Sequence, residues 1–135
     1  MGATAERGEL KLQRAPHTAD DVSVLISLSQ QVNGIVIIGM SEKTGISVVS
    51  KILGETFEEL DELAKSGIGE LGNVITGLAS TGLSEVGYEV KISPPTLIQG
   101  KGTLISTLDF YRVVVPIKTE LGDIHLYVAL TDTPI

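Results

Sequence analysis

The chain has 135 residues, of which 42% are hydrophobic and 20% charged, and its formal net charge is −7 at pH 7. This length suits one buried core, and the composition is typical of a globular chain. The acidity disfavours nucleic-acid binding, and the absence of cysteine excludes disulfides, thiol catalysis and thiolate metal sites. Uninterrupted apolar runs, such as residues 35–38, are far shorter than the roughly 20 residues of a membrane span. We therefore expect a cytoplasmic protein without metal, nucleic-acid or membrane partners.

The first nineteen residues are polar and lack periodicity, so they predict a loose tail with one candidate strand at residues 10–13. A single domain is expected over residues 20–135. Within residues 22–28, apolar side chains alternate with serines, which is typical of a half-buried strand. Residues 34–40 are apolar and predict a central strand that forms a hairpin with the first.

Two helices are predicted after this hairpin. The first covers residues 42–53, with Ser41 as its N-cap and Gly54 as its stop. The second is expected to be capped by Thr56 and to end just before Gly87. Its apolar residues keep helical spacing over more than five turns and are expected to form one buried face: Leu60, Leu63, Ala64, Ile68, Leu71, Val74, Ile75 and Leu78.

The last third of the chain predicts strands. They are expected at residues 88–92, 96–98, 103–106, 110–118 and 124–130. Pro94 and Pro95 separate the first two of them, because two prolines cannot both lie inside a central ladder. This order of elements, with hairpins at both ends, predicts an α+β fold in which two helices pack on one face of a largely antiparallel sheet.

The long helix is unusual in its glycines and in one polar stripe. Each of its five glycines, at positions 67, 69, 72, 77 and 82, costs roughly 0.5–1 kcal/mol relative to alanine. Two explanations remain open: close packing inside the fold, or a surface that another backbone must approach. At about 100° per residue, one stripe beside the apolar face contains Ser66, Glu70, Asn73 and Gly77. Glu70 and Asn73 can grip a cation and orient a water, but they make a poor acid/base pair because asparagine cannot take up and release a proton in a catalytic cycle.

The spacing of this stripe resembles a family motif. Ser66 is followed by three residues and Glu70, then by two residues and Asn73, and twenty-one residues separate Asn73 from Pro95. This pattern, together with the order of elements over residues 20–130, is similar to the CheC/CheX/FliY family of chemotaxis response-regulator phosphatases, and to its CheX members in particular. The first helix has no Glu-x-x-Asn, so one site per chain is expected, as in CheX members. CheX members usually begin with a helix, where this chain has the polar tail.

The resemblance implies a phosphatase acting on the aspartyl phosphate of a phosphorylated CheY-like receiver domain. It implies that Asn73 orients the attacking water and that Glu70 pairs with a lysine of the receiver. Pro95 is expected to shape its strand. The residues expected to meet the partner are Ser66, Gly69, Gly72 and Gly77. The chain needs no cofactor of its own on this reading, because the receiver supplies Mg²⁺, and a homodimer is expected.

Other functions are compatible with the same residues. A non-catalytic docking or dimerisation module of the same fold could bind a receiver or a motor component. A small-molecule binder of this fold class would require a closed apolar pocket with converging polar groups. His125 lies near Asp123 in the sequence, but no nucleophile accompanies them, so a catalytic triad is not expected.

Overall fold

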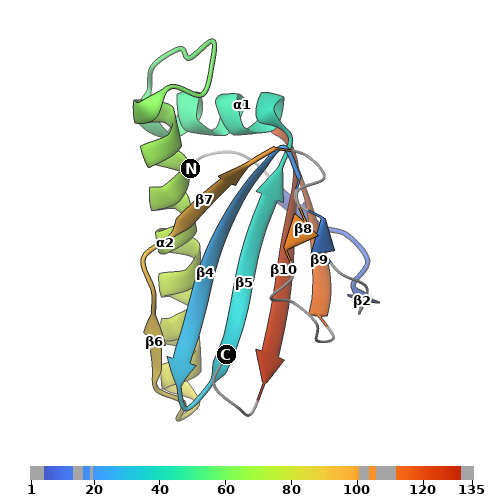
Figure 1. Ribbon diagram of the computed structural model, residues 1–135, viewed down its shortest axis with the longest axis vertical. Helices are drawn as coiled ribbons and strands as arrows, with labels where there is room; N and C mark the ends of the chain where they lie inside the picture. Colours follow the sequence, from blue (N-terminus) through green and yellow to red (C-terminus); the bar gives the residue numbers. More distant parts are fainter. Residues whose placement is uncertain (1–4, 14–16, 19, 101–103, 106–111, 132–135) are drawn as a thin grey trace.

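The computed structural model describes residues 5–13, 17–18, 20–100, 104–105 and 112–131. The elements are β1 (Ala5–Arg7), β2 (Lys11–Gln13), β3 (His17–Thr18), β4 (Val22–Gln30), β5 (Asn33–Met40), α1 (Glu42–Leu53), α2 (Glu62–Glu85), β6 (Val90–Ile92), β7 (Thr96–Gln99), β8 (Leu104–Ile105), β9 (Arg112–Thr119) and β10 (Gly122–Thr131). The main sheet has the order β1-β9-β10-β5-β4-β6, with β2 also on β9 and β7 also on β4 (Figure 1). All the pairings within the described residues are antiparallel.

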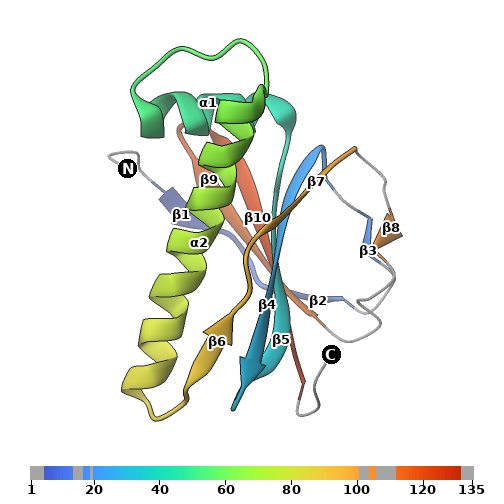
Figure 2. The same cartoon turned by 60° about the vertical axis from the view of Figure 1, so that its left-hand side comes forward.

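Both helices lie on the same side of the sheet. Figure 2 shows α1 across one end of the strands and α2 running along the face beside β4. The predicted α+β architecture, with a long and a short helix on one face, is confirmed. None of the described helices combines the length and the apolarity that crossing a membrane requires.

Residues 5–13 do not form a loose tail. β1 pairs with residues 117–119 of β9, and β2 pairs with residues 112–114 of the same strand. The candidate strand at residues 10–13 is thus confirmed as β2, whereas the tail interpretation is wrong for residues 5–13. Polar residues suit this position, because a strand at the edge of a sheet is only half covered by protein.

The first helix is built as its sequence predicts. The hydroxyl oxygen of Ser41 accepts a hydrogen bond from the Thr44 amide at 3.1 Å, and Gly54 ends the helix in the left-handed region with φ 67°. These two residues satisfy terminal backbone groups that the helix itself leaves unpaired.

The second helix begins later than predicted. Its N-cap is Asp61, whose carboxylate accepts from the Ala64 amide at 2.8 Å, so Thr56 does not cap it. The Phe57 amide donates to the Ser50 hydroxyl at 3.2 Å, and Leu60 is already buried before the helix starts. These contacts hold residues 55–61 as a loop against α1. The predicted end before Gly87 is confirmed, with Val86 as the C-cap.

The buried face of α2 is narrower than its apolar residues suggest. Leu63, Val74 and Leu78 are 55%, 50% and 70% exposed, which contradicts their expected place in the core. Small residues occupy much of the inner side, where the buried positions are Ala64, Gly67, Ile68, Gly72 and Thr76. The helix can therefore lie close to the sheet, with Leu71 and Ile75 partly buried against the core, whereas Leu63, Val74 and Leu78 fall on its exposed faces.

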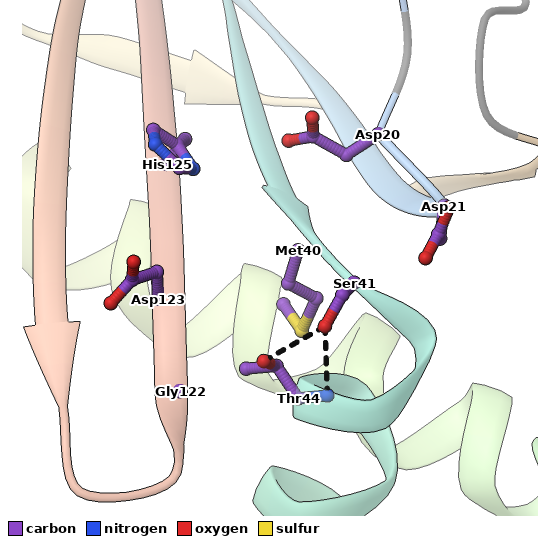
Figure 3. Close-up of a pocket in the computed structure, with 8 residues that line it drawn as sticks. All are labelled: Asp20, Asp21, Met40, Ser41, Thr44, Gly122, Asp123 and His125. Carbon is purple, nitrogen blue, oxygen red and sulfur yellow. Dashed lines mark hydrogen bonds between the residues drawn. The ribbon is translucent and has the colours of Figure 1, made fainter.

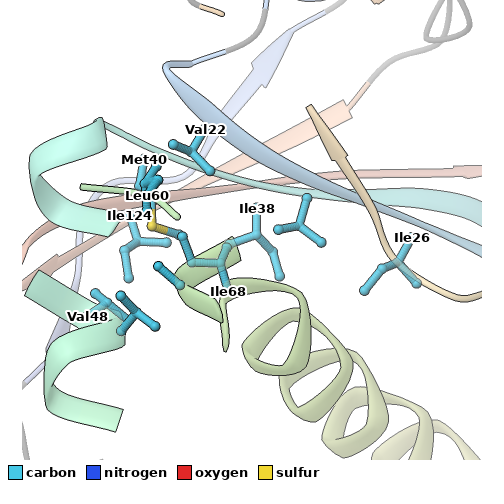
Figure 4. Close-up of a cluster of buried hydrophobic side chains, with 11 residues drawn as sticks. Val22, Ile26, Ile38, Met40, Val48, Leu60, Ile68 and Ile124 are labelled. Atoms are coloured by element: carbon cyan, nitrogen blue, oxygen red, sulfur yellow. The ribbon is translucent and has the colours of Figure 1, made fainter. Parts of the chain in front are cut away.

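The core fills the space between the sheet and the helices (Figure 4). Its buried members are Val22, Val24, Ile26, Ile38, Met40, Val48, Val49, Leu60, Ala64, Ile68 and Ile124. A second, smaller cluster lies on the other face of the sheet and contains Ile35, Ile37, Val114, Tyr127 and Ala129. Alternate residues of β5 and β10 thus serve two separate clusters, as the period of a strand requires.

Candidate functional site

One surface hollow gathers most of the predicted motif. It has a volume of about 440 Å³ and is lined by Glu62, Lys65, Ser66, Gly69, Glu70, Asn73, Pro95 and Leu97. The structure therefore brings together the predicted Ser66, Gly69, Glu70, Asn73 and Pro95. The hollow lies between the first half of α2 and the neighbouring edge of the sheet.

The two prolines bring the edge of the sheet to the helix. β6 and β7 pair with different parts of β4, at residues 28–30 and 22–25. Between them, Ser93 remains attached to β4, because its amide donates to the Ser27 carbonyl at 3.0 Å and its hydroxyl accepts from the Ser27 amide at 2.8 Å. Pro95 then approaches α2, and its Cγ lies 3.6 Å from where a Cβ on Gly69 would be. Pro95 is thus one wall of the hollow.

The polar side chains of the motif are available to a partner. Ser66 and Glu70 are exposed, and Asn73 is half-buried. None of these three side chains forms a hydrogen bond or an ion pair with another side chain of the described residues. The carboxamide of Asn73 can therefore both donate and accept outside the fold, and the Glu70 carboxylate can accept beside it, because residues i and i+3 share a helix face.

Two of the helix glycines serve packing inside the fold. A Cβ on Gly67 would lie 2.5 Å from a methyl group of Val49 in α1, and a Cβ on Gly72 would lie 2.9 Å from a methyl group of Val24 in β4. The expectation that Gly72 meets the partner is therefore wrong, because this residue is buried against the sheet. Gly77 is different, since a Cβ there would meet nothing within 4 Å.

The sequence interpretation missed three residues of the hollow. Glu62 and Lys65 precede Ser66 and Gly69 by four positions, so the helical repeat could have placed them on the same side. Leu97 had no comparable signal, because only the pairing of β7 with β4 brings it to the helix. Lys65 forms an ion pair with Glu62, with 3.3 Å between Nζ and Oε1.

A second hollow, of about 490 Å³, holds His125 and Asp123 (Figure 3). Two of its carboxylates hold elements together: the Asp21 carboxylate accepts from the Glu42 amide at 3.1 Å, and Asp20 accepts from the Tyr127 hydroxyl at 3.2 Å. Burial, followed by the Asp20 charge, raises the pKa of Tyr127, so its hydroxyl stays protonated as the donor. No group of three or more histidine, aspartate or glutamate residues in the described ranges is arranged to hold a metal ion.

The comparison with known families decides the family of this chain. A family model described as "Chemotaxis phosphatase CheX" matches residues 22–118, from the start of β4 almost to the end of β9. The chain belongs to the CheX family. The matched segment contains every residue of the motif hollow, and the similarity that the motif predicted is confirmed.

Relatives and solved structures agree with membership in the CheX family. The CheY-P phosphatase CheX of Thermotoga maritima is 34% identical over 116 residues, which are 84% of this chain and 73% of that protein. The crystal structure of CheX from Desulfovibrio desulfuricans has a TM-score of 0.84 and 26% identity, over 96% of this chain and 87% of the other. A CheX-CheY-BeF3-Mg complex from Borrelia burgdorferi matches with a TM-score of 0.79 and 28% identity, over 93% and 82% of the two chains.

Proposed function

We propose that this CheX-family chain accelerates hydrolysis of the aspartyl phosphate on a phosphorylated CheY-like receiver in chemotaxis signalling. The observation that carries the proposal is the hollow in which Glu70 and Asn73 stand beside Pro95 without bonds to other side chains of the described residues. The Thermotoga relative is named a CheY-P phosphatase, and the Borrelia structure joins a CheX to a CheY. Both support the assignment of a receiver as the partner.

The proposed reaction requires this chain only to position the attacking water and to dock the receiver. A water attacks phosphorus, the bond between phosphorus and the aspartyl oxygen breaks, and the products are inorganic phosphate and the free carboxylate. The carboxamide of Asn73 accepts a hydrogen bond from that water and donates to it or to a phosphoryl oxygen, which fixes the water in line. Asn73 neither takes up nor releases a proton in this step. The receiver brings the phosphoaspartate, the Mg²⁺ and a lysine, so no cofactor is assigned to this chain.

Glu70 is assigned to docking. Its exposed carboxylate lies one turn from Asn73 and would pair with the receiver's lysine, which holds the phosphoryl group over the amide. Ser66 is assigned a hydroxyl contact to the receiver at the other side of Glu70. Gly69 keeps the floor of the hollow free of a side chain, so a loop of the receiver can enter it.

The experiment that tests this function is the rate of phosphate release from a phosphorylated receiver with and without the chain. A catalytic amount of the chain is expected to accelerate release about 100-fold, which corresponds to roughly 2.7 kcal/mol. Binding of the receiver without acceleration would instead favour the non-catalytic docking module.

Gly77 allows a matched test of close approach by the partner. Gly77→Ala and Gly82→Ala are each expected to raise the free energy of unfolding by about 0.5–1 kcal/mol, because both are helical glycines whose Cβ would meet nothing within 4 Å. Only Gly77→Ala is expected to weaken receiver dephosphorylation, because Gly77 shares the motif stripe. Equal activity of the two variants, measured together with denaturant melts, would remove Gly77 from the partner surface.

A homodimer in the cytoplasm is also part of the proposal. In the described sheet, β6 and β7 pair only with β4, so their outer backbone groups are available to a second copy. Sedimentation velocity at micromolar concentration is expected to give twice the mass of the chain. A monomer at that concentration would contradict the dimer and leave the phosphatase assignment unaffected.

A further inference from the structure

Lys65 is the one basic side chain among the described residues that line the motif hollow. Its side chain is only 29% exposed, whereas that of its ion-pair partner Glu62 is 94% exposed. The lysine is therefore held by the fold along most of its length, and the glutamate is almost free in solvent. Exposed ion pairs of this kind contribute little to stability, so the pair is easily exchanged for another.

The ammonium group of Lys65 lies far from Asn73, the residue proposed to orient the attacking water. Long side chains on a helix point back toward its N-terminus, and the contact of Nζ with Glu62 shows this for Lys65. Asn73 is eight residues further along, about 12 Å at 1.5 Å per residue. Lys65 thus lies at the opposite end of the hollow from the carboxamide and does not reach a water bound there.

The charge of the hollow makes this lysine important. The chain carries a net charge of −7, and the other ionisable residues of the hollow are the acids Glu62 and Glu70. A receiver that holds Mg²⁺ beside its phosphoaspartate must present carboxylates around that cation. Two acidic surfaces repel unless local opposite charges face each other.

We propose that Lys65 binds a carboxylate on the surface of the receiver and gives up Glu62 when it does so. This inference rests on the proposed partner, a phosphorylated receiver, and adds the group that makes docking of two acidic proteins favourable. Lys65 acts in binding, while Asn73 acts in the chemical step. Glu62 competes with the partner for the ammonium and so weakens binding in the free chain.

The test measures affinity for a receiver held in its phosphorylated form by BeF₃⁻ and Mg²⁺, by fluorescence anisotropy. Lys65→Glu is expected to raise Kd by about tenfold or more. Lys43→Glu is the matched control: it makes the same change in net charge in the first turn of α1, outside the hollow, and is expected to change Kd less than about twofold. Equal losses for the two variants would reduce the effect to net charge and overturn the proposal.

A second pair of variants tests the competition by Glu62. Glu62→Gln is expected to lower Kd several-fold, and Glu59→Gln, an equal change on the exposed loop before α2, is expected to leave it unchanged. In turnover assays Lys65→Glu should raise KM without lowering kcat, and a loss confined to kcat would contradict a docking role. If wild type binds the receiver without accelerating hydrolysis, the phosphatase proposal fails while the Kd measurements still decide the role of Lys65. Absence of any binding by wild type overturns both.

Discussion

Replacing Asn73 by alanine is expected to remove most of the acceleration of receiver dephosphorylation, a loss of about 100-fold. The side chain forms no hydrogen bond with another side chain of the described residues, so the fold loses little with it. Alanine is also a better helix former than asparagine, so the melting temperature should stay constant or rise. Single-turnover phosphate release from the phosphorylated receiver measures the effect.

Asn73→Asp tests whether the reaction requires the amide group itself or only a side chain of that shape. An aspartate fills almost the same volume, but its carboxylate cannot donate and repels the phosphoryl oxygens, so this variant should be as slow as Asn73→Ala. Glu70→Ala should raise KM more than it lowers kcat, because Glu70 docks the partner. If the double variant Glu70→Ala, Asn73→Ala released phosphate from the receiver at the wild-type rate, the assignment of the site would be wrong.

Replacing Ile68 by alanine is expected to lower the free energy of unfolding by about 2–5 kcal/mol. Ile68 is fully buried on α2 and is part of the core cluster between both helices and the sheet, with its Cδ1 3.3 Å from where a Cβ on Gly45 would be. Three elements meet at this side chain, so the cavity left behind cannot close by a movement of one of them. Urea unfolding, followed by circular dichroism, gives the value.

Leu78 is the matched control on the same helix. It is 70% exposed, and its replacement by alanine is expected to change the free energy of unfolding by less than about 0.5 kcal/mol. A cost for Leu78→Ala as large as that for Ile68→Ala would contradict the orientation of α2.

The features predicted correctly depend on local signals. Ser41 and Gly54 bound α1 because capping residues act within a few positions of themselves. Glu70 and Asn73 share a hollow because helical periodicity alone brings them together. Pro95 could be assigned to the same site only from its fixed distance to Asn73 in the family motif. Its place beside Gly69 depends on a tertiary arrangement, in which β6 and β7 pair with different parts of β4.

The errors arise where tertiary contacts decide between local alternatives. Thr56 and Asp61 are both acceptable N-caps, and the burial of Leu60 with the Phe57–Ser50 bond selects the later one. The orientation of Gly72 could not be read from its neighbours, because small and large residues both occur on the inner face of α2. The edge position of β1 and β2 depends on β9, about a hundred residues away in the sequence.

The motif side chains make no bonds to other side chains of the described residues. Selection for what the hollow recognises is therefore separate from selection for folding. Substitutions at Ser66, Glu70 or Asn73 can therefore change what the hollow recognises with little loss of folding free energy. A variant that loses catalysis by such a change would keep a folded surface that can still bind a partner. Ile68 and Gly72, on the inner side of the same helix, have no such freedom.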